Sequence, residues 1–289
     1  MLQFNTPKLK YFSYRHGQIA YRETGNGPTL FLLHGMNGNS KSWANLFYSL
    51  SSSYRVIAWD APSFGCSDIF GDDIFDYRNA AKALLKDLKI EDAIIIGHSM
   101  GGIIAAQLAA DDDISISGLV LSSSHLGFAY PKGEELIPRY ANRLKFFSNN
   151  SAPKSYTLDR AKVSTPKGTS EDVIKFLANV AEDLREESIL DGGRMSQETD
   201  NREICSKIKV PVLILSGAQD TIISTEMHNA LVNAIPHAEQ FIFSEAGHAS
   251  YVEYPNLFQK HIEDLAKKVW KIKYFSPEPN YFSNIQKEQ

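Results

Sequence analysis

The chain has 289 residues, of which 43% are hydrophobic and 22% are charged. This length suits one large α/β domain, or a core domain that carries a modest insert. The formal net charge is −4, and acidic and basic residues are mixed along the chain, so the sequence has no basic patch for nucleic acid and no polybasic stretch for an anionic membrane.

The first 125 residues are predicted to contain most of a parallel sheet. An antiparallel pair of strands comes first, with His16-Gly17-Gln18 as the turn between them, and short apolar runs then alternate with longer helical patterns. Continuous apolar strands that alternate with helices are typical of parallel βαβ units. The predicted strands are 11–15, 19–23, 29–33, 55–59, 93–96 and 118–121, and the predicted helices are 40–50, 77–88 and 100–110.

The strand pattern stops between residues 126 and 206, where the sequence is polar and helical. Strands resume at 210–215 and 240–243, with helices over 225–234 and 255–270. A helical insert in a parallel sheet predicts a lid over the carboxyl edge of the sheet, where open α/β sheets bind their ligands. The predicted division is therefore a core of 1–125 and 207–289 and a helical cap of 126–206, with 275–289 as a surface tail.

Gly97-His98-Ser99-Met100-Gly101 matches G-x-S-x-G and stands between a predicted strand and a predicted helix of small residues. This context separates a nucleophile turn from a chance match in a helix cap. A strand that reverses sharply into a helix forces the serine into strained backbone angles and leaves no space for side chains at Gly97 and Gly101. We therefore predict Ser99 as the nucleophile, at a helix N-terminus.

A serine hydroxyl is a weak nucleophile until a histidine takes its proton. His248 follows a glycine on a loop just past the strand predicted at 240–243, which places it at the carboxyl edge of the sheet. We predict His248 as the general base, with His125 as the second candidate.

The histidine in turn needs an acid that orients its ring, and in this arrangement the chain order is serine, acid, histidine. Asp220 lies on the loop after the strand predicted at 210–215 and is the predicted acid. The position after the preceding strand reads Ser122-Ser123-Ser124 and offers no carboxylate, and Glu245 is expected on the wrong side of the His248 loop.

Acyl transfer also needs N–H donors that face the oxyanion. The backbone N–H of Met100 follows the nucleophile and is the first predicted donor. The second is assigned to Met36, on the loop after the strand predicted at 29–33. His34 on that loop is expected to be structural.

Five segments in order, HGMNGNS (34–40), DAPSFGCSD (60–68), GHSMGG (97–102), SGAQD (216–220) and AGH (246–248), resemble the α/β-hydrolase family over about residues 12–270. The resemblance implies an α/β fold with an eight-stranded, mostly parallel sheet, a helical cap inserted after the sixth strand, and neither cofactor nor metal. Ser63 departs from the glycine that close relatives usually carry, and we expect it to stiffen its loop without touching the chemistry.

Within this family, Ser99 argues against haloalkane dehalogenases and epoxide hydrolases, which carry aspartate there. The segment that leads into Pro211 is similar to carboxylesterases, enol-lactonases and cofactor-free haloperoxidases. The predicted function is hydrolysis of an ester, lactone or related acyl bond of a small molecule through an acyl-enzyme on Ser99. The alternatives are carbon–carbon bond hydrolysis of ring-fission products, acyl transfer and ligand sensing. Carbon–carbon hydrolases usually show asparagine at the position of His98, which weakens the first alternative.

The predicted cap offers two sets of side chains for substrate recognition. Long cationic side chains on helices usually face water, so most of the arginines are expected to do so, although any of them could meet a carboxylate. The aromatic side chains suggest an apolar patch for an acyl or aryl group, or the core of the cap itself. The arginines are Arg139, Arg143, Arg160, Arg185, Arg194 and Arg202, and the aromatic residues are Phe128, Tyr130, Phe146 and Phe147.

The remaining expectations concern compartment and assembly. Cys66 and Cys205 lie far apart and share no metal-ligand spacing, so both are expected to be reduced thiols. No apolar run approaches the roughly 20 residues of a membrane span, and the N-terminus has no signal-peptide apolar region. We expect a cytoplasmic protein that acts on a small molecule as a monomer or homodimer.

Overall fold

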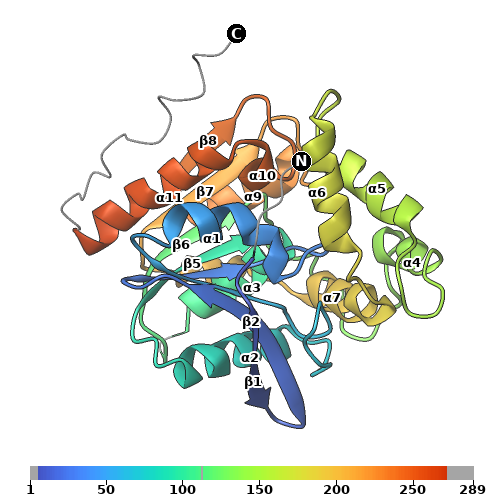
Figure 1. The fold of residues 1–289 in the computed structure, drawn as a ribbon, viewed down its shortest axis with the longest axis horizontal. Helices are drawn as coiled ribbons and strands as arrows, with labels where there is room; N and C mark the ends of the chain where they lie inside the picture. The colour runs from blue at the N-terminus through green and yellow to red at the C-terminus, as the bar shows by residue number, and fades with distance from the viewer. Residues whose placement is uncertain (1–5, 112, 272–289) are drawn as a thin grey trace, which may run out of the picture.

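An eight-stranded sheet forms the centre of the computed structural model, which describes residues 6–111 and 113–271 (Figure 1). The strands are β1 (Leu9–Tyr14), β2 (Gly17–Thr24), β3 (Thr29–Leu33), β4 (Arg55–Trp59), β5 (Ala93–His98), β6 (Ile116–Ser122), β7 (Val212–Gly217) and β8 (Glu239–Phe243). Their order is β1-β2-β4-β3-β5-β6-β7-β8. The pairs β1–β2 and β2–β4 are antiparallel and all the other pairs are parallel, which confirms the predicted sheet.

The central strands are buried on both faces. Every residue of β3 and β5 is buried, which explains why both read as continuous apolar runs rather than as alternating ones. In the parallel register, Leu30 of β3 lies between Val56 of β4 and Ile94 of β5. The carboxyl ends of these strands therefore meet at one edge of the sheet, where Ser99 follows β5.

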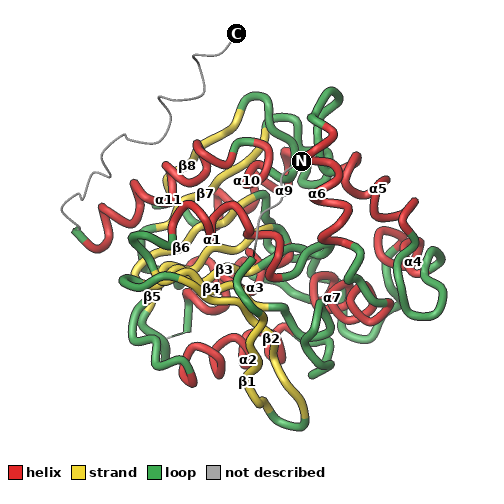
Figure 2. Tube along the Cα trace, in the orientation of Figure 1, coloured by secondary structure: helices red, strands yellow, loops and turns green. Residues whose placement is uncertain are grey.

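Helices cover both faces of the sheet (Figure 2). One hydrophobic core lies between the sheet and the helices α2, α3 and α9, and a second lies between the sheet and α1 and α11. Outside the insert, the helices are the short 3-10 helix η1 (Ser40–Trp43), α1 (Ala44–Leu50), α2 (Ile74–Asp87), α3 (Met100–Ala109), α9 (Thr225–Ala234), α10 (Ser250–Glu253) and α11 (Pro255–Trp270).

A helical insert separates β6 from β7, as predicted. It consists of α4 (Pro138–Leu144), α5 (Lys154–Val163), α6 (Glu171–Ala181), α7 (Glu186–Glu198) and α8 (Arg202–Ser206). In Figure 1, α4 to α7 lie together beside the sheet. Helix α4 packs on α7 so closely that a Cβ atom at Gly193 would lie 2.8 Å from the ring of Tyr140. The glycine in α7 is therefore explained by packing.

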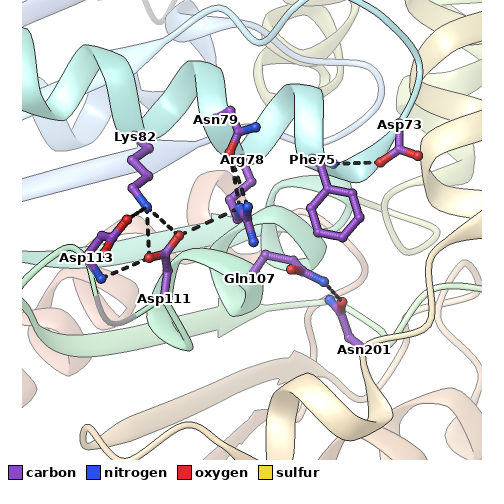
Figure 3. Close-up of polar contacts among 9 residues, drawn as sticks. All are labelled: Asp73, Phe75, Arg78, Asn79, Lys82, Gln107, Asp111, Asp113 and Asn201. Atoms are coloured by element: carbon purple, nitrogen blue, oxygen red, sulfur yellow. Dashed lines mark hydrogen bonds and ion pairs between the residues drawn. The ribbon is translucent and has the colours of Figure 1, made fainter.

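The two ends of the insert are joined to each other and to α3. The N–H of Asn201 donates to the carbonyl of Leu126 at 2.8 Å, which links the end of the insert to its start. The side-chain amide of Asn201 donates to the carbonyl of Ile103 and accepts from Gln107 at 2.7 Å (Figure 3). These buried contacts hold the base of the insert against α3, the helix that follows Ser99.

A second polar cluster holds α2 against the end of α3. Lys82 on α2 donates to Asp111 at 2.8 Å and to Asp113 at 2.7 Å, and Arg78 lies 3.7 Å from Asp111 (Figure 3). Because none of these groups lines the cavity that Ser99 lines, we assign them to the support of the fold.

The structure corrects one detail of the first hairpin. The predicted turn was His16-Gly17-Gln18, but the turn residues are Arg15 and His16, because Gly17 already pairs with Tyr14 at the start of β2. Arg15 adopts a left-handed conformation with φ 48°, which allows the sharp reversal between β1 and β2. The predicted tail at 275–289 lies outside the described residues.

Candidate active site

Ser99 stands at the sharp turn between β5 and α3. Its φ of 52° lies in the left-handed region, and it is the N-cap residue of α3. A Cβ atom at Gly97 would lie 2.4 Å from the carbonyl oxygen of Gly101, and one at Gly101 would lie 2.2 Å from that of Leu33. Both positions therefore exclude a side chain, as the sequence predicts. Such strain is found where the surrounding structure holds a functional group in place.

Asp220 and His248 form a direct hydrogen bond. The Nδ1 atom of His248 lies 2.8 Å from Oδ2 of Asp220, and the two side chains are 8% and 5% exposed. The other carboxylate oxygen accepts the N–H groups of Ile222 at 2.7 Å and Ile223 at 3.0 Å. With Nδ1 donating to the carboxylate, the Nε2 atom of His248 is the free base.

The pKa of Asp220 reflects this environment. Burial raises the pKa, but the charge of His248 and the hydrogen bonds from His248, Ile223 and Ile222 together lower it below the usual value. Asp220 is therefore an ionised carboxylate at neutral pH, which is the form that fixes the tautomer and orientation of a histidine.

Ser99 and His248 line the same cavity, which has a volume of about 340 Å³. The His248 ring lies 4.8 Å from the ring of His98, the residue before the serine. Among the described residues, no hydrogen bond joins the Ser99 hydroxyl to the imidazole. Hydrogen bonds of this kind are often long without substrate and shorten in the Michaelis complex.

Met36 lines the cavity from the loop after β3, and Met100 lines it from the first turn of α3. Within the described part of the chain, neither backbone N–H has a hydrogen-bond partner. The loop that carries Met36 is held by His34, which accepts the N–H of Ala61 at 3.0 Å on Nε2 and contacts the carbonyl of Gly35 at 2.8 Å through Nδ1. His34 therefore braces this loop, as expected.

The loop after β4 connects the core to the insert. Asp60 accepts the N–H groups of Ser40 at 2.7 Å and Cys66 at 2.9 Å, so its carboxylate stabilises the loop. Ser63 has a φ of 68°, a conformation that favours the glycine of close relatives. Its hydroxyl donates to Asp191 of α7. The serine therefore also ties the loop to the insert, a contact that the sequence did not reveal.

The two alternative residues, His125 for the base and Glu245 for the acid, have other contacts. His125 is buried and lines the cavity, but its Nδ1 accepts the N–H of Gly127 at 3.1 Å, and no carboxylate of the described residues contacts its ring. Glu245 is exposed and accepts from Gln219 at 3.1 Å. Asp220 is thus the carboxylate that contacts His248.

The end of α5 contacts both loops that carry this pair. The backbone N–H of His248 donates to the carbonyl of Ser164 at 2.9 Å, and the hydroxyl of Thr221 donates to the carbonyl of Val163 at 3.2 Å. Sequence patterns contain no signal for these contacts, because backbone carbonyls are present at every position. The insert therefore supports the loops as well as covering the site.

The side chains of the insert that line the cavity are not the mixture of arginines and aromatic residues that the sequence suggested. Arg139, Arg143 and Arg160 line the cavity, and the other arginines considered do not. The aromatic side chains pack elsewhere: Phe128 against His125 and Tyr140, and Phe146 and Phe147 against Tyr156, while Tyr130 is 42% exposed. The aromatic set thus belongs mainly to the packing of the insert. Arg139 and Arg143 are four residues apart on one helix and therefore lie on the same face, and this spacing was the sequence signal that could have grouped them.

The sequence profile of the family described as "alpha/beta hydrolase fold" matches residues 28–255. The chain belongs to this family. It is a hydrolase whose helical insert and eight-stranded sheet are those that the resemblance implied.

Relatives of this hydrolase include enzymes that act on esters and lactones. A pimeloyl-(acyl-carrier protein) methyl ester esterase of Vibrio parahaemolyticus is 28% identical over 86% of the chain and 98% of the relative. The enol-lactonase of Burkholderia xenovorans has a similar fold, with a TM-score of 0.78, 23% identity and coverage of 89% and 100%. A thermophilic esterase of Thermogutta terrifontis gives a TM-score of 0.79, 20% identity and coverage of 91% and 99%.

The described part of the hydrolase contains neither a candidate metal site nor a candidate membrane span. Within residues 6–111 and 113–271, no group of three or more His, Cys, Asp or Glu side chains is arranged to hold a metal ion. In the same part of the chain, no helix combines the length and the apolar character that a membrane span requires.

Buried histidines should make the hydrolase sensitive to acid. Burial and then repulsion from Arg139 lower the pKa of His125 to about 3, and burial followed by His248 lowers the pKa of His98 well below its usual value of 6.5. An unfolded histidine then binds a proton more readily than a folded one. The stability that these histidines contribute is therefore fully present well above pH 6.5 and falls as the pH decreases, by about 1 kcal/mol for His125 between pH 6.5 and about 5.5.

His125→Asn tests this expectation, because asparagine does not titrate and can still accept the Gly127 N–H. Urea unfolding at several pH values should show a shallower loss of stability in the variant, by about 1 kcal/mol over that interval. Parallel curves for the variant and the unchanged protein would contradict the prediction.

Proposed function

We propose that this hydrolase cleaves carboxylic ester or lactone bonds of small molecules through an acyl-enzyme on Ser99. The observation that carries the proposal is the 2.8 Å hydrogen bond between Asp220 and His248 at the cavity that Ser99 also lines. A nucleophile, an oriented base and two N–H donors at one cavity are the parts that acyl transfer requires.

In the proposed acylation step, Ser99 Oγ attacks the carbonyl carbon while Nε2 of His248 takes its proton. The carbonyl oxygen becomes an oxyanion, which the N–H groups of Met36 and Met100 stabilise. The tetrahedral intermediate then breaks its bond to the leaving alcohol oxygen, which receives the proton from His248. Asp220 stays ionised throughout and stabilises the imidazolium.

Deacylation repeats the sequence with water in place of the alcohol. His248 takes a proton from the water as its oxygen attacks the acyl carbon, and the second tetrahedral intermediate expels Ser99 Oγ, which takes the proton back. The products are a carboxylic acid and the regenerated enzyme. We assign residues 1–125 and 207–289 to the catalytic core and 126–206 to a cap that excludes water from these steps.

The relatives support the bond type. The Vibrio relative is a methyl ester esterase and the Burkholderia relative is an enol-lactonase, and both of these activities hydrolyse an acyl–oxygen bond. The same bond type suits a site that offers N–H donors for one developing oxyanion. Esters and lactones are therefore the first substrates to test.

The test is a panel of p-nitrophenyl esters and lactones, combined with labelling by a fluorophosphonate, which reacts with activated serines. We expect sustained hydrolysis, and a single label on the peptide that contains Ser99, with activity lost as labelling proceeds. Labelling at another residue, or activity that survives complete labelling, would refute the proposal. A product formed only with an added alcohol or thiol would instead indicate an acyltransferase, and a burst without turnover a ligand-sensing role.

A further inference from the structure

Three arginines of the insert face the cavity above Ser99, and their charge is unbalanced. Arg139 and Arg143 are on α4 and Arg160 is on α5. Among the described residues that line this cavity, none is Asp or Glu. A cavity with three guanidinium groups and no carboxylate has a strongly positive potential.

Neutral acceptors hold two of these side chains in place. Arg143 donates to the hydroxyl of Tyr156 at 2.7 Å and to the side-chain oxygen of Asn37. Arg139 donates to the carbonyl of Ile222 at 2.7 Å. These bonds orient the guanidinium groups but leave their charge uncompensated, because none of the acceptors is ionised.

Arg160 is the least satisfied of the three. Its Nε atom is buried without a hydrogen-bond partner in the described part of the chain. Burial lowers the pKa of its guanidinium, and Arg143 and Arg139 lower it further by repulsion. A buried charge is costly unless an opposite charge pairs with it.

Two of the three arginines elsewhere in the insert pair with carboxylates; the third, Arg185, donates to the backbone carbonyl of Ser67 at 2.7 Å, and its Nε also has no hydrogen-bond partner in the described part of the chain. Arg194 lies 3.1 Å from Asp72 and 3.4 Å from Glu198, and Arg202 lies 3.1 Å from Asp200. The insert thus contains both paired and unpaired arginines, and the three that line the cavity have no carboxylate partner among the described residues. A ligand that carries a negative charge would supply the missing partner.

We propose that the substrate carries an anionic group, a carboxylate or a phosphate, that binds to Arg160 with support from Arg139 and Arg143. This inference rests on the proposed function, because the anion is placed on the molecule whose acyl bond reaches Ser99. Arginine binds both groups through two parallel hydrogen bonds. The cavity of about 340 Å³ lies at the small end of the range for ligand sites, so the substrate class is that of small esters or lactones of acids with a second, charged end.

The test compares three methyl esters of matched length that end in a carboxylate, a neutral carboxamide or a phosphate. The carboxamide has the shape of the carboxylate without its charge. We expect kcat/KM for the preferred anionic ester to exceed that for the carboxamide by about tenfold or more. The anionic ester with the larger kcat/KM identifies the preferred anion as carboxylate or phosphate.

Arg160→Gln should reduce the ratio of kcat/KM for the anionic ester to that for the carboxamide toward one, mainly through a higher KM for the anionic ester. Arg202→Gln is the matched control, because Arg202 is 66% exposed, pairs with Asp200 and lies outside the cavity lining. The melting temperature of Arg160→Gln should not fall, since the substitution removes a charge without a partner. A preference that survives in Arg160→Gln, or its absence in the unchanged protein, would overturn the inference. Failure to hydrolyse any ester would count against the proposed function instead.

Discussion

Ser99→Ala should lower kcat by on the order of 10⁶-fold, the largest effect of any single substitution at this site. The reason is that the covalent route through the serine oxygen is lost, while the N–H donors and the cavity remain. The alanine removes one buried oxygen atom from a turn whose shape is set by Gly97 and Gly101, so the fold should be retained.

The measurement is ester hydrolysis under saturating substrate, with circular dichroism to confirm the fold. Ser52→Ala is the matched control, because Ser52 is exposed and lies after α1, away from the cavity. Substantial activity in Ser99→Ala would disprove the assigned nucleophile, whereas equal losses in both variants would point to a defect in the preparation.

Asp220→Asn should lower kcat by about 10⁴-fold. The asparagine has nearly the same shape, but its amide N–H₂ can face Nδ1 of His248 and favour the tautomer in which Nε2 is protonated. That tautomer cannot take the proton of Ser99. The ionised carboxylate would also be absent when the imidazolium forms, so both the orientation and the charge are lost.

The control for this substitution is Asp264→Asn on α11, where the carboxylate is 43% exposed and pairs with lysines at the surface. We expect the control to retain full kcat. A small effect of Asp220→Asn on kcat, with the protein folded, would show that the contact at 2.8 Å serves stability rather than catalysis.

The local sequence was enough to predict much of the architecture. Buried parallel strands read as short apolar runs, and β3 and β4 were predicted with the bounds that the structure has. The turn at Ser99 was also predictable, because its steric demand falls on glycines within two residues of the serine.

The placement of Asp220 and His248 followed from topology. Both were predicted on loops that leave the carboxyl ends of parallel strands, and such loops lie at one edge of a sheet. The structure brings the two side chains into hydrogen-bonding contact. Their catalytic roles stay predictions until the substitutions are measured.

Only the folded structure shows which groups each arginine of the insert contacts. The insert contains six arginines, and apart from the four-residue spacing of Arg139 and Arg143 no local feature separates them, so most were expected to face water. Whether an arginine meets a carboxylate or a cavity depends on residues far away in the chain, such as Asn37 for Arg143 and Asp72 for Arg194.

The contacts between the insert and the loops that border the cavity also could not be predicted from the local sequence. The carbonyl of Ser164 receives the N–H of His248, and the carboxylate of Asp191 receives the hydroxyl of Ser63. Periodicity reports which face of an element is buried, since burial repeats with the geometry of a helix or strand. It carries no information about which distant atom fills a hydrogen bond, because that pairing exists only after the chain has folded.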